Sequence, residues 1–194
     1  MAKYTQQDNI AQSSIGFQVY SWNTTDKKFE YLVPIVGDPP TMGGEPSTIE
    51  TTEADSKVKT YVSDRQDSPS FTLNYNFDEN GNNYLRAKSA ISSSTSRPFL
   101  MLLPLGSAFM VKATGATWLE GGNPVQGAIS FAQAEEAIFV QDLTTNFTAD
   151  QVAAINAWLG ADTVTTAKAL KDIIDFTSMP AGRETDAVKA ATGA

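Results

Sequence analysis

The chain has 194 residues, of which 41% are hydrophobic and 19% charged, a composition that suits one compact domain with an extension better than two full domains. It contains no cysteine and no histidine, which excludes disulfides, thiolate nucleophiles, imidazole bases and the common zinc sites. The formal net charge of −8 repels phosphate and therefore argues against specific reading of nucleic acid.

The sequence shows no membrane or export signal. Its first residues, MAKYTQQ, lack an apolar core, and the strongest apolar run, at 98–105, is far shorter than the roughly 20 residues of a spanning helix. We therefore expect a soluble product that is made in a cytoplasm.

Two strand candidates lie near the start of the chain, at 16–22 and 29–35. Both carry aromatic and β-branched residues at alternate positions, a pattern typical of half-buried strands. The residues at 23–26 form a plausible turn between them, so this part of the sequence predicts a hairpin.

The alternation of apolar and polar residues ends at residue 36 and does not return until after residue 69. The segment begins with too many glycines and prolines for a helix or a central strand, and it continues as a polar, threonine-rich stretch with few apolar residues. We interpret it as a long extended arm that docks on another surface through a few apolar anchors. The arm is acidic, with seven acids against three bases: Asp38, Glu45, Glu50, Glu53, Asp55, Asp64 and Asp67 against Lys57, Lys59 and Arg65.

The clearest strand follows at 70–77. Phe71, Leu73, Tyr75 and Phe77 alternate with polar residues, which predicts one buried face and one wet face. After a turn, apolar residues at helical spacing predict a short helix over 84–91.

A second hairpin is predicted from 98–103 and 108–113, with 115–119 continuing its second strand. Further strands at 125–131 and 137–140 complete an all-β body. We therefore divide the chain into a β domain at 1–143, which contains the arm, and a helical C-terminal extension and tail at 144–194.

The C-terminal extension changes period. Thr148 and Gln151 have the spacing of a capping box, and Gly160 is a natural helix terminator. A second helix is expected at about 165–175, and 182–194 resembles a frayed tail.

No motif in the sequence supports catalysis or the binding of a metal or cofactor, so we expect a protein that is not an enzyme. The acidic turn at 78–83 lacks the glycine and the glutamate that a calcium loop needs at its sixth and twelfth positions. The adjacent Glu135 and Glu136 point to opposite faces of a strand, which favours solvated charge over a catalytic pair. Trp22, Trp118 and Trp158 fit burial in a core or interface, with an exposed sugar-binding platform as the alternative.

Three stretches of the first half together resemble the major tail protein, or tail tube protein, of long non-contractile-tailed bacteriophages. They are 35–52 (IVGDPPTMGGEPSTIETT), 59–62 (KTYV) and 71–77 (FTLNYNF). In that family a strand leads through a Gly-Gly-x-Pro-x-x-Ile turn into a threonine-rich arm, and a Phe-x-Leu-x-Tyr strand then precedes a short helix. The order of elements matches from about residue 15 to 140.

This resemblance implies a mainly β fold, a β-sandwich or half-barrel with a flanking short helix. It also implies stacked hexameric rings that form a tail tube, a conduit for genome delivery whose acidic wall suits passing DNA. The implied partners are other copies of the chain and the tape measure, tail terminator and tail tip proteins. The implied place is the virion tail, with assembly in the host cytoplasm.

The resemblance also implies roles for named residues. Thr72, Asn74 and Asn76, on the polar face of the clearest strand, are candidates for the lumen wall. The arm that reaches neighbouring subunits and the next ring is carried by Gly43, Gly44, Glu45, Pro46, Ile49, Val58, Tyr61 and Val62.

The C-terminal extension departs from the family pattern. It could decorate the outside of the tube, contact the next ring or cover the β body, and the sequence does not choose among these. Two other functions remain open at this point. One is a carbohydrate- or receptor-binding β-module of a phage or bacterial surface, and the other is a glycosidase with two carboxylates in a cleft.

Overall fold

The computed structural model describes residues 17–33, 35–37, 46–50, 61–66, 70–76, 88–89, 95–121, 126–135, 137–160, 164, 166–180 and 182–193. The strands are β1 (Gln18–Asn23), β2 (Lys28–Val33), β3 (Ile35–Val36), β4 (Pro46–Glu50), β5 (Tyr61–Gln66), β6 (Ser70–Asn76), β7 (Arg97–Leu102), β8 (Ala108–Gly121), β9 (Gln126–Gln133), β10 (Ile138–Val140) and β11 (Ile174–Asp175). The helices are α3 (Ala149–Leu159), α4 (Asp186–Thr192) and the 3-10 turns η1 (Leu170–Ile173) and η2 (Phe176–Ser178). The fold is mainly β, as the sequence predicts.

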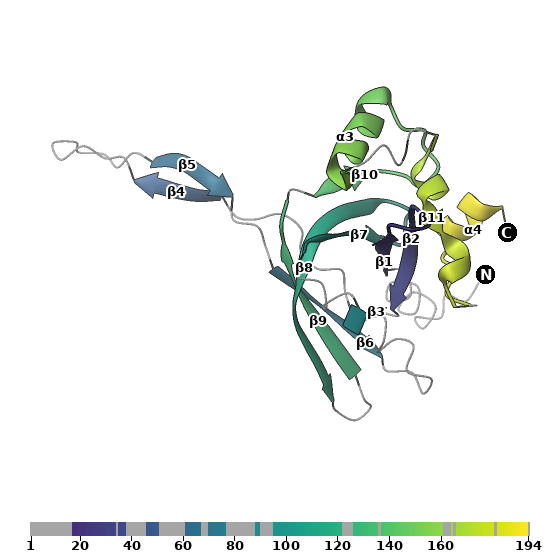
Figure 1. Cartoon of the computed structure of the whole chain (residues 1–194), viewed down its shortest axis with the longest axis horizontal. Helices are drawn as coiled ribbons and strands as arrows, with labels where there is room; N and C mark the ends of the chain where they lie inside the picture. Colours follow the sequence, from purple (N-terminus) through teal and green to yellow (C-terminus); the bar gives the residue numbers. More distant parts are fainter. Residues whose placement is uncertain are drawn as a thin grey trace, which may run out of the picture.

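The main sheet is strongly curled (Figure 1). Its strands follow the order β11-β2-β1-β7-β8-β9-β6-β3, and β10 also pairs with β8. Strands β2 and β3 are separated only by Pro34, yet β2 pairs with β1 while β3 pairs with β6 at the other end of this path. One chain segment therefore links the second strand of this path to its last strand, and the sheet has a barrel-like form, which we call the barrel.

Inward-facing side chains of the barrel form the first of two apolar clusters, the inner core. In strand β6, for example, Phe71, Leu73 and Tyr75 point inward and are buried, while the residues between them are exposed. The Phe131 ring stacks on Phe71 at a centroid distance of 5.2 Å and meets the Phe99 ring edge-on at 4.8 Å. Aromatic packing of this kind adds to the burial free energy.

Glycine is required at position 127 by the inner core. The buried Tyr75 ring lies directly over the Gly127 backbone, and a β-carbon added there would overlap the ring carbons and the hydroxyl. The two residues are paired across β6 and β9, so the absent side chain of one provides the space for the ring of the other.

The second cluster, the outer core, lies between the outward face of β1, β2, β7 and β8 and the C-terminal extension. Tyr20, Phe29, Leu100 and Met110 contribute from the strands. The extension contributes buried residues from α3, η1, β11, α4 and the segments between these elements: Ile155, Trp158, Val164, Leu170, Ile173, Ile174, Met179, Val188 and Ala191. The extension therefore covers the β body, and β11 adds a short parallel strand to the edge of β2.

A buried polar network fixes the extension to the barrel. Gln18 of β1 is 2% exposed, and its Nε2 donates to the carbonyl oxygen of Arg183 at 2.6 Å and to the Met179 sulfur at 3.1 Å. The Tyr20 hydroxyl donates to Gln18 Oε1 at 2.6 Å. Both polar groups of the Gln18 side chain thus have partners although water is excluded.

The first predicted helix of the extension is confirmed. Thr148 caps α3 in the predicted capping box, since its side chain accepts from the Gln151 backbone while the Gln151 side chain accepts from the Thr148 backbone. Gly160 ends α3 in the left-handed conformation, with φ of 75°. The N-terminal and C-terminal signals were both readable from the sequence because each depends on local chemistry.

Two expectations for the rest of the extension are wrong. The helix expected at about 165–175 is replaced by η1 and β11, because the Asp172 carboxylate accepts from the backbone of Lys168 and Ala169 and holds a tight turn. The expected frayed tail contains α4, which Thr185 caps and whose Val188 and Ala191 are buried. Of the short helix expected at 84–91, the structure describes Lys88 and Ser89, both helical.

Candidate assembly surfaces

The outward face of the barrel has a second half, formed by β6, β9 and β8 from Ala113 onward, which the extension does not cover in the described part of the chain. Its residues are exposed or half-buried, and we call this surface the open face. It comprises Ser70, Thr72, Asn74, Thr114, Ala128, Ser130 and Ala132.

The open face includes two of the three residues that we proposed for the lumen. Thr72 and Asn74 are both exposed, and Thr72 lies opposite Ser130 of β9. The two hydroxyls are 2.8 Å apart and form a hydrogen bond. Asn76 ends β6 opposite Gln126, and its side chain lies outside the described part. The assignment of these residues to a lumen stays a prediction.

The arm contains a hairpin that our sequence analysis did not predict. β4 and β5 pair antiparallel, with Ile49 opposite Val62 and Glu50 opposite Tyr61. They form a separate two-stranded sheet, which lies apart from the barrel at one end of the molecule's long axis (Figure 1). The β-branched residues at 48–52 and 58–62 could have indicated these strands.

The hairpin contains four of the eight arm residues that the resemblance implied. Pro46 and Ile49 belong to β4, and Tyr61 and Val62 belong to β5. Gly43, Gly44, Glu45 and Val58 lie outside the described residues. The docking role of all eight stays a prediction.

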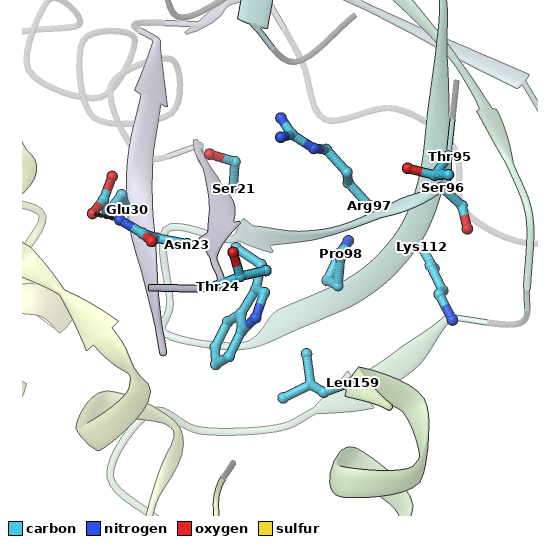
Figure 2. A pocket seen from close by; sticks show the side chains of 11 residues that line it. Ser21, Asn23, Thr24, Glu30, Thr95, Ser96, Arg97, Pro98, Lys112 and Leu159 are labelled. Carbon is cyan, nitrogen blue, oxygen red and sulfur yellow. Dashed lines mark hydrogen bonds between the residues drawn. The ribbon is translucent and has the colours of Figure 1, made fainter. Parts of the chain in front are cut away.

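A pocket of about 520 Å³ lies between β1, the start of β7 and the end of α3 (Figure 2). Figure 2 shows Arg97 and Lys112 on opposite sides of the start of β7. The Lys112 Nζ forms an ion pair with Glu135 at 2.8 Å, and Arg97 donates to the Ser89 carbonyl at 3.1 Å. Both cations are thus engaged by groups of the chain itself.

The pocket does not bring together the groups that a glycosidase needs. Glu30 is the one carboxylate among its described lining residues, and it accepts from the Asn23 amide. Hydrolysis of a glycosidic bond needs two carboxyl groups at a controlled separation. Within the described residues, no group of three or more acidic side chains is placed to hold a metal ion either.

The tryptophans are placed largely as structural residues. Trp158 is 7% exposed in the outer core, and half-buried Trp22 packs edge-on against Phe29 at 4.8 Å. Trp22 also lines the pocket, and the Trp118 side chain lies outside the described part. Of the helices that the structure describes, none is long and apolar enough to cross a membrane.

Two solved structures share the fold at a TM-score of 0.50. One is a chain from the tail of an empty gene transfer agent particle, solved with C6 symmetry, which is 13% identical and matches 65% of this chain and 96% of that chain. The other comes from the PVC sheath–tube complex of an extracellular contractile injection system in its extended state. It is 12% identical and matches 70% of this chain and 98% of that chain.

No known protein family matches the sequence, and no curated protein matches it significantly. At identities of 12–13% the structural likeness shows the fold alone. The solved chains are matched almost completely, whereas about a third of this chain has no counterpart in them. The chain therefore has a tail-tube-like fold, the barrel found in tails and in injection systems, to which it adds further residues.

Proposed function

We propose that this chain is a structural subunit of a phage tail tube, which self-assembles into stacked hexameric rings and forms a conduit for genome delivery. It acts by assembly and without catalysis. The observation that carries the proposal is the division of the barrel's outward surface, in which one half is covered by the extension and the other half is left uncovered by the residues that the structure describes.

This division supports one orientation of the subunit within the proposed tube. A bore needs a smooth wall, so the bulky extension belongs on the outside and the open face, with Thr72 and Asn74, lines the lumen. The β4–β5 hairpin projects from the barrel and suits the contact with neighbouring copies. Among the described strands β4 and β5 pair only with each other, so their outer edges can pair with another copy, and the anchors are buried on assembly. The C6 symmetry of the gene transfer agent tail supports the six-fold ring.

The proposal includes the class of tail. Residues 35–77 resemble the tube proteins of long non-contractile tails, whereas the solved structures with the same fold come from a gene transfer agent and from a contractile injection system. Because the gene transfer agent and the injection system share this fold, the fold does not distinguish classes of tail. The proposal of a non-contractile tail therefore depends on the sequence resemblance. Tape measure, terminator and tip proteins are the partners that such a tube needs, in a virion tail assembled in the host cytoplasm.

Negative-stain electron microscopy of the purified chain at several concentrations, with and without its own virion lysate, tests the proposal. We expect hollow tubes or six-fold rings, accompanied by a concentration-dependent sedimentation coefficient. A chain that remains monomeric under all these conditions would contradict the tube. A glycan-binding screen would then test the alternative of a carbohydrate- or receptor-binding module.

A further inference from the structure

Charge is distributed unevenly between the two halves of the barrel surface. Strands β6 and β9 and the part of β8 from Ala113 to Gly121 together contain 24 residues, of which Glu120 alone is charged. At the chain's average of 19%, a segment of that size would carry about five charges. The exposed and half-buried side chains of the open face therefore present no formal charge in the described part of the chain.

The single charged residue of these strands is not in register with the open face. Glu120 pairs with Gly127, whereas the open-face residue Ala128 pairs with the preceding Leu119. The described residues of the extension, by contrast, carry both signs at exposed positions, including Asp150, Lys168 and Glu184. The described charges of the extension thus lie away from the open face.

The polar groups of the open face are also partly engaged with one another. The Thr72 and Ser130 hydroxyls share a hydrogen bond at 2.8 Å, and the methyl groups of Ala128 and Ala132 lie opposite Asn74 and Ser70. Hydroxyls that bond to each other leave fewer donors for an outside ligand. The ammonium group of Lys112, two positions before Thr114 on β8, is paired with Glu135 at 2.8 Å. The described side chains of the open face are wettable and include no ammonium or guanidinium group to hold a phosphate.

Such a surface is unusual for an exposed sheet. Soluble proteins place lysines and other charges on exposed strands, where the charges prevent association. A duplex nucleic acid is held mainly by cationic side chains, which release its counterions, and carboxylates repel it. A wall without cationic side chains or carboxylates neither holds nor repels the duplex.

We propose that the open face is a charge-neutral sliding surface, over which a duplex nucleic acid passes without being held or repelled. This inference rests on the proposed function, because it requires the open face to line the bore. It replaces the acidic wall that the family resemblance implied, and it assigns the acidic character of the chain to surfaces outside the bore.

The test compares assembled tubes of four chains for retention of a short fluorescent DNA duplex. The lysine variant is Thr72→Lys, with Thr72→Gln as the neutral control of similar length. A second control, Ala153→Lys, adds the same charge on the exposed surface of α3. Tubes are incubated with duplex, treated with nuclease and sedimented, and the protected duplex is measured at about 50 and about 200 mM salt.

Wild-type and Thr72→Gln tubes should retain duplex only at background level at both salt concentrations. Thr72→Lys tubes should retain nuclease-protected duplex at low salt and lose it at least about tenfold at high salt, because each ring adds cations that displace counterions. Ala153→Lys tubes should bind only duplex that the nuclease removes.

Three results would overturn the inference while leaving the tube intact. They are protected duplex in wild-type tubes at the level of the lysine variant, no protected duplex in Thr72→Lys tubes, and tube formation by Thr72→Gln but not by Thr72→Lys. The last result would make the open face an interface between copies. Failure of the wild-type chain to form tubes would instead contradict the proposed function.

Discussion

At the scale of single residues, Gln18 and Tyr20 show how a buried polar pair joins two parts of the chain. Tyr20 is fully buried, and burial, followed by the nearby Tyr31, raises the pKa of its hydroxyl above the ordinary value of 10.0. The hydroxyl therefore stays protonated in the folded state, where it donates to Gln18. The sequence did not indicate that Gln18 and Tyr20 join the barrel to the extension, because the partners of Gln18, Met179 and Arg183, lie about 160 positions away.

We expect Tyr20→Phe to lower the free energy of unfolding by about 1–3 kcal/mol near pH 8, since Gln18 Oε1 loses its buried donor. The folded-state pKa of Tyr20 lies above that of the unfolded chain. Below about pH 10 the tyrosine is protonated in both states, and the wild-type protein keeps the full stability that the buried hydroxyl contributes. Above about pH 10 the unfolded chain releases the proton while the folded chain holds it, so the free energy of unfolding falls as the pH rises. The variant should lose less stability than the wild type over that alkaline range.

Urea unfolding at pH 8 and pH 10.5 measures both effects. Tyr31→Phe is a suitable comparison, because Tyr31 is also buried and belongs to the same cluster, and the substitution leaves the Tyr20 hydroxyl in place to donate to Gln18. Equal stability of Tyr20→Phe and wild type at pH 8, together with equal alkaline slopes, would contradict the assigned network.

At the scale of elements, the C-terminal extension is the part whose placement the sequence left open. The structure shows that it covers the β body, and the outer core draws residues from both parts. Sequence patterns located α3 well, because its caps are local signals. They failed for η1, β11 and α4, whose conformations depend on contacts with β1, β2 and each other.

We expect a chain that ends after Leu143, the limit of the predicted first domain, to lose cooperative folding. Burial of one large apolar side chain contributes about 1.5–3 kcal/mol. The loss of Ile155, Trp158, Leu170, Ile173 and Ile174 from the outer core thus approaches the whole stability of an ordinary domain, about 5–15 kcal/mol. Circular dichroism melting and dye binding to exposed apolar surface measure the loss.

A chain that ends after Glu184 is the matched control. It lacks α4 but keeps α3 and η1, so it should remain folded with a reduced melting temperature, since Val188 and Ala191 are the buried residues of α4. A native-like, soluble 1–143 chain with the wild-type melting temperature would show that the extension is an independent addition.

At the scale of the whole molecule, the barrel and the β4–β5 hairpin are separate sheets. The hairpin makes no strand pairing with the barrel in the described residues. We therefore expect deletion of residues 46–67, closed by a short glycine–serine linker, to leave the melting temperature of the barrel within a few degrees of wild type. The deletion should abolish the stacking of rings into long tubes, because the hairpin is the proposed contact with neighbouring copies.

Particle length by negative-stain microscopy, combined with melting by circular dichroism, separates the two effects. The single substitution Ile49→Ser in the intact hairpin gives a milder control, which should shorten tubes without affecting the melt. Tubes of normal length from the deletion variant would rule out a stapling role for the hairpin.

The sequence by itself determined the features that depend on local periodicity and local chemistry. The alternation of Phe71, Leu73 and Tyr75 predicted a strand with one buried face, and Thr148 with Gln151 predicted the start of α3. The absence of cysteine and histidine and the pattern around Gly43 and Pro46 limited the classes of function. These signals are readable because each depends on residues a few positions apart.

The tertiary structure alone decided which surfaces face one another. The pairing of β3 with β6, the contact between the Tyr75 ring and Gly127, and the cover of the outer core by the extension all join residues far apart in the chain. The same holds for the open face, whose neutrality emerges only when β6, β8 and β9 lie side by side. Long-range pairing is set by the summed burial of many side chains, and no single segment of the sequence contains that sum.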